Sequence, residues 1–253
     1  MPQIMIWVVL LAFFWEFVDA SAGMGYGTAM SPILLLMDFS PLEIVPAILI
    51  SNIGIGFLAA FWHHKFKNID FQARDDIEIM GLIAVSGLLA VIAAVWAAIS
   101  LPQWVVIGYI AGLIVAVGIF MLVRKKWEGR YSPLRLVLLS FFAAFNKGVT
   151  GGGFGPVVVG GQMFSGVESR KAVGIASMAE SLISLTGALA YFVASPQPLN
   201  WSLTFSLVLG SLIAVPMAAY FISRLPALKH RSFIGVTCIV VGLLTLFKFF
   251  APS

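Results

Sequence analysis

The sequence predicts an all-α polytopic membrane protein, built from two inverted structural repeats that each contain a glycine-broken helical hairpin and three transmembrane helices. Three observations lead to this fold class. The 253 residues are 60% hydrophobic and 10% charged, with a mean hydropathy of +1.02, which leaves too little polar surface for a soluble domain. Apolar runs of spanning length, about 20 residues, recur along the chain. Finally, a short glycine-rich phrase occurs twice, beginning at Gly23 and again at Gly151, 128 positions later.

The first element of each repeat contains the glycine phrase. The two phrases are Gly23-Met24-Gly25-Tyr26-Gly27 and Gly151-Gly152-Gly153-Phe154-Gly155. They interrupt hydrophobic stretches at about 4–37 and about 134–166. Backbone without side chains at membrane depth is tolerated only where it is buried in protein or lines a cavity. Each stretch is therefore either one long broken span or a hairpin of two short helices that enters and leaves on the same side.

Three predicted spans follow each hairpin, and each approaches the ~20 residues that a hydrocarbon core of about 30 Å requires. The predicted spans are residues 42–62, 77–98 and 103–123 in the first repeat and 169–194, 199–223 and 231–250 in the second. The first repeat thus occupies residues 1–123 and the second residues 134–253, with a cytoplasmic linker at 124–133.

Lysine and arginine positions distinguish the two forms of the broken stretches. If both are hairpins, the loops at 63–78, 124–135, 168–171 and 224–231 fall on one face and carry 13 of the 15 basic residues. If both are single spans, the basic residues divide nine to five, which fits the positive-inside rule poorly. Hairpins give each repeat an odd number of crossings, so the second repeat is inverted and both termini lie outside. A nominal eight-span protein with two kinked helices is the alternative.

The composition also excludes several classes of protein. The connections are too short to hold a nucleotide-binding domain, so the chain alone is not an ATP-driven pump. Cys238 stands alone, which excludes an internal disulfide and a cysteine metal cage. The net charge of +4 reflects topology signals rather than nucleic-acid binding. We therefore expect no cofactor, metal or nucleic acid, a multi-pass location in the cell membrane with lipids around the chain, and an interfacial position for His63 and His64.

The two glycine phrases form the predicted binding site. Each precedes a short apolar helix, which Pro156 opens in the second copy and Thr28 caps in the first. Two helix N-termini with bare N–H groups then point toward the centre from opposite sides, an arrangement that favours an anion. Close packing of small residues is the alternative explanation. The predicted substrate-binding residues are Gly23, Met24, Gly25, Tyr26, Gly27, Ser51, Asn52, Asn146, Lys147, Gly151, Gly152, Gly153, Phe154, Gly155 and Ser177.

Ionisable residues at membrane depth are the other functional candidates. Lys147 could supply the counter-charge of an anion, snorkel to a nearby surface, or pair with an intramembrane acid. Glu180 is the leading candidate for proton coupling, and its repeat mate at the 128-residue offset is Asn52. Glu16 and Asp19 are further coupling candidates, since their spacing places both carboxylates on one helix face. A position at a water-exposed tip of the hairpin would equally explain the presence of these two acids.

Further short segments follow the glycine phrases in a fixed order. Ala172-Val173-Gly174 opens the next helix in the second half, and Val45-Pro46-Ala47 stands in its place in the first half. The loop after the first long span contains Asn68-Ile69-Asp70-Phe71. Over essentially the whole chain, this ordered and duplicated set resembles the sulfite exporter TauE/SafE family, also described as sulfonate and sulfite permeases. Pro46 departs from the family pattern, because it occupies an expected glycine position.

The resemblance implies movement of sulfite, an organosulfonate or a related small sulfur oxyanion across the cytoplasmic membrane, most often as export. We therefore expect a secondary transporter that works by alternating access, with proton coupling through Glu180, Glu16 or Asp19. A cation or divalent-metal transporter that uses the same three acids is one alternative, and a passive anion channel is another. An enzyme is not expected, because the sequence contains no Ser/His/Asp set, aspartate pair or His-Glu-x-x-His phrase.

Overall fold

The computed structural model describes residues 3–22, 26–123, 132–224 and 231–250, and within these ranges all regular structure is helical. The prediction of an all-α fold is thereby confirmed. The helices of the first half are α1 (Ile6–Ala22), α2 (Tyr26–Leu36), α3 (Pro41–Lys65), α4 (Arg74–Ser100) and α5 (Gln103–Val123). Those of the second half are α6 (Pro133–Thr150), α7 (Phe154–Phe164), α8 (Ser169–Ala194), α9 (Trp201–Arg224) and α10 (Arg231–Phe250).

Five helices of the described part, α3, α4, α5, α8 and α9, are long and apolar enough to cross a membrane. Helix α10 has 20 residues, and its described apolar portion covers Val236–Phe250. These six helices coincide closely with the six predicted spans. The remaining four helices include α2 and α7, which have 11 residues each and are too short to cross a hydrocarbon core of about 30 Å.

Local sequence signals set the helix boundaries. Helix α3 begins after Ser40, whose backbone N–H and hydroxyl both donate to the Glu43 carboxylate at 2.9 Å, with Pro41 at the first helical position. This is the arrangement of a capping box followed by an N-terminal proline. Helix α6 starts in the same way, because Ser132 precedes Pro133 and its hydroxyl accepts the N–H of Arg135.

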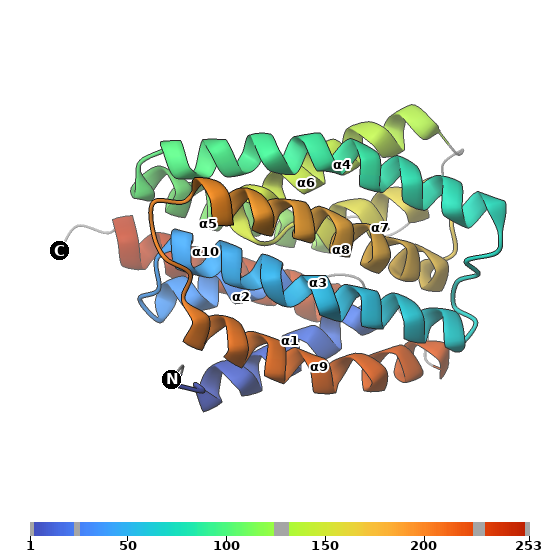
Figure 1. Cartoon of the computed structure of the whole chain (residues 1–253), viewed down its shortest axis with the longest axis horizontal. Coiled ribbons are helices and arrows are strands. Elements are labelled where there is room, and N and C mark those ends of the chain that lie inside the picture. Colours follow the sequence, from blue (N-terminus) through green and yellow to red (C-terminus); the bar gives the residue numbers. More distant parts are fainter. Residues whose placement is uncertain (1–2, 23–25, 124–131, 225–230, 251–253) are drawn as a thin grey trace.

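Both glycine-broken stretches are hairpins. Figure 1 shows that α1 starts at the end of the bundle where the N-terminus lies and that α2 returns to this end before α3 begins. Helices α6 and α7 form the corresponding pair, which enters from the opposite end of the bundle (Figure 1). Helix α10 ends at the same end of the bundle at which α1 begins (Figure 1).

The two halves have matching helix boundaries and matching neighbours. Helices α2 and α7 start at Tyr26 and Phe154, α3 and α8 at Pro41 and Ser169, and α5 and α10 at Gln103 and Arg231, each pair 128 residues apart. Helix α1 packs on α9 as α6 packs on α4, while α3 contacts α8 and α5 contacts α10. Each of these contacts is preserved when the halves are exchanged. The observation supports the inverted repeat, which stays a prediction.

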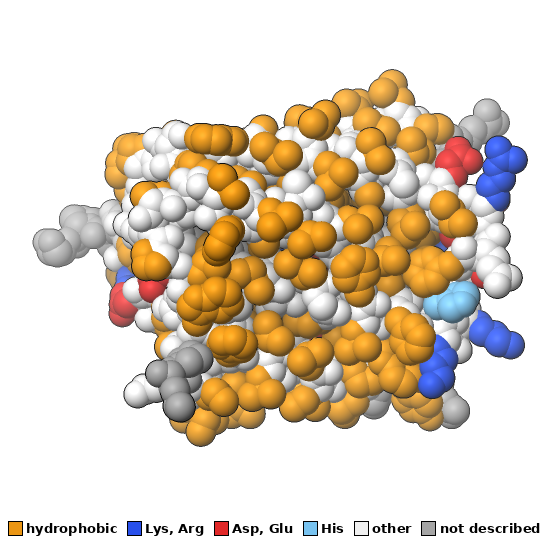
Figure 2. Space-filling view, in the orientation of Figure 1, with side chains coloured by type: hydrophobic (Ala, Val, Ile, Leu, Met, Phe, Trp, Pro, Cys, Tyr) orange, Lys and Arg blue, Asp and Glu red, His pale blue; other side chains and the backbone are white. Residues whose placement is uncertain are grey.

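The molecular surface divides into an apolar belt and two polar ends. Large exposed hydrophobic side chains cover the face between the ends (Figure 2). We call the end that contains residues 63–74 and 165–171 the basic end, and it includes Lys65, Lys67, Arg74, Arg170 and Lys171. The opposite end includes Lys248, which forms an ion pair with Asp38. This distribution agrees with the hairpin arrangement that the lysine and arginine positions predict.

Candidate functional site

The tips of the two hairpins touch each other. An added Cβ on Gly27 would overlap the carbonyl of Gly151, and one on Gly152 would lie 2.5 Å from the carbonyl carbon of Gly27. Only glycine lets two backbones approach this closely. The φ angles of Gly151 and Gly153, 74° and 79°, lie in the left-handed region, so the second tip also needs glycine for its turn. In this conformation the duplicated phrases provide close packing, the alternative that the sequence left open.

Hydrogen bonds within the protein satisfy the backbone N–H groups of the three glycines that begin the second glycine phrase. Their acceptors are the Lys147 carbonyl for Gly151 at 2.8 Å, the Thr150 hydroxyl for Gly152 at 3.0 Å and the Thr28 hydroxyl for Gly153 at 3.0 Å. The bond to Thr28 also joins the two hairpins. These three N–H groups, which we expected to be bare, therefore already have acceptors in this conformation.

The short helices α2 and α7 also begin at other residues than the sequence predicted. Helix α7 begins at Phe154, so Pro156 is its third residue and not its first. Helix α2 begins at Tyr26, so Thr28 lies within it and does not cap it. The backbone N–H of Tyr26 instead donates to the carboxylate of Asp19.

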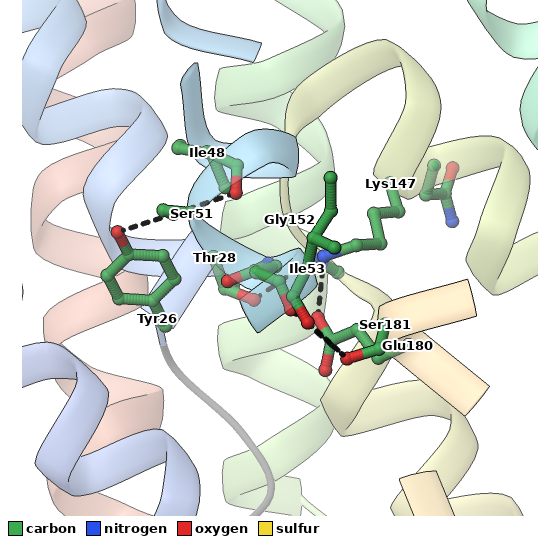
Figure 3. A network of polar contacts seen from close by, with 12 residues as sticks. Tyr26, Thr28, Ile48, Ser51, Ile53, Lys147, Gly152, Glu180 and Ser181 are labelled. Carbon is green, nitrogen blue, oxygen red and sulfur yellow. Dashed lines mark hydrogen bonds and ion pairs between the residues drawn. The ribbon is translucent and has the colours of Figure 1, made fainter. Parts of the chain in front are cut away.

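Lys147 lies in the last turn of α6 and is fully buried. Its ammonium Nζ contacts Oε1 of Glu180 on α8 at 2.6 Å, and Figure 3 shows the lysine side chain extending toward that carboxylate. Each charge stabilises the other, since an isolated charge at this depth costs several kcal/mol. The sequence had left this ion pair open as one of three explanations for Lys147.

A small cavity lies beside this ion pair, between α1, α3 and α8. Its lining residues are Glu16, Asp19, Ala20, Asn52, Ile55, Gly56, Ala59, Ser177 and Glu180. The structure therefore brings together the three predicted coupling acids with two predicted substrate-binding residues, Asn52 and Ser177. Lys147 reaches the cavity through its contact with Glu180.

Close contact between α3 and α8 forms one wall of the cavity. The Ser181 hydroxyl lies within hydrogen-bonding distance of two α3 carbonyls, that of Asn52 at 3.2 Å and that of Ile53 at 3.0 Å. An added Cβ on Gly56 would lie 2.8 Å from the Ser177 carbonyl oxygen. This approach places Asn52 and Glu180, the predicted repeat mates, on facing helices. Ser181 was missed at the sequence level, because one serine on an apolar helix gives no distinctive signal.

Other predicted site residues lie outside the cavity lining. The hydroxyl groups of Tyr26 and Ser51 hydrogen-bond at 3.0 Å, and Phe154 packs in the apolar core. Asn146 accepts a hydrogen bond from the Tyr109 hydroxyl, while its amide nitrogen is without a partner among the described residues. The predicted positions outside the described residues are Gly23, Met24 and Gly25.

The expectation of an interfacial His63 is wrong, because its side chain is fully buried. Its Nε2 lies 3.1 Å from the carbonyl oxygen of Ala20 in α1, and its Nδ1 accepts the side-chain amide of Asn68 at 3.0 Å. These bonds connect the end of α3 to the last turn of α1, next to the cavity. The Asn68-Ile69-Asp70-Phe71 phrase was the available signal, since it supplies the amide that orients the imidazole.

Comparisons with known proteins agree with this architecture. Residues 8–245 match the family described as "Sulfite exporter TauE/SafE". The chain is also similar to the "Probable membrane transporter protein YtnM" of Bacillus subtilis (strain 168), with 26% identity over 242 residues, which cover 91% of this chain and 79% of that protein. No solved structure matches the chain. With a family match over nearly its whole length, the chain belongs to the TauE/SafE family of membrane transporters.

Proposed function

We propose that the protein is a secondary transporter that exports a small sulfur-containing oxyanion, sulfite or an organosulfonate, by alternating access. The family description supports the substrate class. The basic end is assigned to the cytoplasm by the positive-inside rule, which places both termini outside. One repeat would then move relative to the other and expose the site to each side in turn.

The observation that carries this proposal is the buried ammonium of Lys147 beside a cavity. A lysine at membrane depth is expensive and generally marks a functional site, and its charge attracts an anion into a region of low dielectric constant. The cavity also presents the Asn52 side chain, which can hydrogen-bond an oxyanion. The glycine phrases would allow the hairpin tips to separate around the ligand and close again.

Charge balance suggests how protons take part. In the described conformation Glu180 neutralises Lys147 at 2.6 Å. An incoming anion that binds Lys147 displaces this carboxylate, and a proton on Glu180 then avoids an uncompensated negative charge. The anion and one proton would therefore cross together. A pH gradient would accelerate transport from the more acidic side and oppose it from the more alkaline side, and each pH unit would be equivalent to a tenfold concentration gradient, about 1.4 kcal/mol.

Flux measurements in liposomes test this function. Sulfite, thiosulfate, sulfoacetate, sulfate and chloride are offered in turn to the reconstituted protein, with and without a pH gradient. We expect saturable flux of sulfite or the sulfonate, accelerated by the pH gradient. Saturation and coupling also separate a transporter from a passive channel.

The variant Lys147→Met, with Lys171→Met as its matched control, locates the site. Lys171 forms an ion pair with the buried Asp76 at 2.8 Å, so its loss also leaves a buried carboxylate unpaired but lies away from the cavity. Loss of a charged hydrogen bond worth about 1.5–3 kcal/mol should weaken anion binding by roughly 10–100-fold in Lys147→Met only. Unchanged affinity in Lys147→Met would remove the lysine from the site.

Cation transport is the second candidate, because three carboxylates line the cavity. Within the part of the chain that the structure describes, no three His, Cys, Asp or Glu side chains are placed to hold a metal ion, which favours the anion. Stabilisation of the purified protein by sodium or a divalent metal, lost in Glu180→Gln, would reverse this preference.

A further inference from the structure

Two buried polar side chains face the cavity with unused hydrogen-bonding capacity. Glu16 is 4% exposed, and among residues 3–22, 26–123, 132–224 and 231–250 its carboxyl group has no hydrogen bond or ion pair. Asn52 is 6% exposed, and its side-chain amide is likewise without a hydrogen bond in that part of the chain. Buried polar groups in proteins are nearly always paired, so this combination points to a ligand.

Contacts with other groups separate Glu16 from the other two acids of the cavity. Glu180 is paired with the Lys147 ammonium. Asp19 contacts the first backbone N–H of α2. Glu16 has neither kind of partner, and an ionised carboxylate buried without a partner costs several kcal/mol. Such a group takes up a proton and becomes a neutral acid.

Titratable groups from several helices surround Glu16. Asp19 on the same helix and Glu180 on α8 are acidic neighbours that disfavour a further negative charge, whereas Lys147 is the opposing positive charge. Helix α2 contributes the phenol of Tyr26, and α3 contributes His63, whose imidazole contacts the Ala20 carbonyl. Helix α9, which covers α1, has only Tyr220 and Arg224 as ionisable residues, both toward its C-terminal end.

We propose that Glu16 is protonated and that its O–H, together with the Asn52 amide, donates hydrogen bonds to the oxyanion in the cavity. This inference rests on the proposed function and specifies how the same site recognises its substrate. Lys147 supplies the charge, while Glu16 and Asn52 supply neutral donors. The Ser177 hydroxyl adds little, because it already donates to the Val173 carbonyl at 3.0 Å.

The proposal explains how a cavity lined by three acids can accept an anion. An ionised Glu16 would repel the oxyanion and offer it no donor, whereas a protonated carboxyl group has one O–H to give. The sign of the pH dependence follows directly. Anion binding is strong where Glu16 is protonated and weakens as the pH rises and the proton is lost.

Three variants of Glu16, chosen for their hydrogen-bonding ability, test the donor role. Sulfite and methanesulfonate are titrated into the purified full-length protein over a range of pH. Glu16→Gln keeps a neutral donor, so we expect affinity within about threefold of the wild type and a weaker dependence on pH. Glu16→Met keeps the length without a donor and should bind about 10–100-fold more weakly. Glu16→Asp keeps the titratable acid and should retain the pH dependence.

Infrared spectroscopy of the wild type tests the protonation state without relying on a variant's affinity. The C=O stretching band of protonated carboxyl groups should be present in the wild type, weaker in Glu16→Gln and unchanged in the control Glu43→Gln. Glu43 is a suitable control, because its carboxylate accepts hydrogen bonds from Ser40 and Asn200 at the opposite end of α3. Absence of the band from a folded wild-type protein would overturn the proposal.

The binding outcomes distinguish this inference from the function on which it rests. A wild type that binds neither probe overturns the anion function and the donor role together. A wild type that binds both, with Glu16→Met binding equally well, overturns the donor role alone. Tighter binding by Glu16→Gln than by the wild type would show that Glu16 is ionised and repulsive. If Glu16→Met does not fold, Glu16→Gln and the infrared band still decide the question.

Discussion

Substitution of Gly152 by alanine should force the two hairpin tips apart. The added Cβ would lie 2.5 Å from the carbonyl carbon and oxygen of Gly27 and 2.6 Å from the backbone nitrogen of Thr28. These are backbone atoms in the first turn of α2, so no side chain can rotate away to relieve the contact. Gly152 itself has no left-handed φ, and the substitution therefore tests steric contact without added backbone strain.

The expected destabilisation is that of an overpacked core, about 1–3 kcal/mol. For a chain of this size each kcal/mol corresponds to a fall in melting temperature of roughly 2–4 °C. Gly54→Ala is the matched control, because an added Cβ at Gly54 has nothing within 4 Å and alanine favours a helix by about 0.5–1 kcal/mol over glycine. The control should be as stable as the wild type or slightly more stable.

The assay is thermal unfolding of both purified variants in detergent, followed by flux in liposomes. Gly152→Ala should unfold at a lower temperature than Gly54→Ala and transport more slowly, because the tips no longer close. Equal melting temperatures and equal flux would refute the reasoning, since they would mean that the tips do not stay in contact in the resting protein.

Three further predictions concern buried polar contacts and use thermal unfolding as the measurement. Either Lys147→Met or Glu180→Gln alone should destabilise the protein by about 3–5 kcal/mol, because the other charge remains buried and unpaired, whereas the double variant should cost less. Strict additivity would mean that the two charges do not interact. Thr28→Val should cost about 0.5–1.5 kcal/mol through loss of the bond to Gly153, and no change would show that this bond is absent in solution. His63→Leu should cost about 1–3 kcal/mol by leaving its buried partners unsatisfied, and a neutral effect would place the imidazole at the surface after all.

Much of the fold was predictable, because the requirements of membrane insertion are visible directly in the sequence. Apolar runs and flanking charges located the long helices to within a few residues, and the start of α3 at Pro41 follows from local capping chemistry. The duplicated glycines coincide with the breaks between α1 and α2 and between α6 and α7. Their function was harder to predict, because glycines that approach a ligand and glycines that approach another backbone have the same sequence pattern.

The composition of the cavity could be predicted only in part. Glu16, Asp19 and Glu180 were each recognised as unusual at membrane depth, and Asn52 was found through the 128-residue offset. The sequence could not assign partners, because the pairing of Lys147 with Glu180 depends on how α6 and α8 pack together. The burial of His63 also depends on long-range packing. Its position next to a loop in the sequence did not indicate that the side chain is buried.

The polar residues of the two halves differ although the helices that hold them correspond. At the offset of 128 residues, Asp19 corresponds to Lys147 and Asn52 corresponds to Glu180. A strictly symmetric pair of halves would hold either two acids or two lysines at the first pair of positions, and neither set would be neutral. Divergence at these positions gives one ammonium with one carboxylate partner, and it leaves Asn52 as a neutral group. The duplicated backbone therefore builds two similar hairpins, while the polar side chains differ between the halves and make the proposed anion site asymmetric.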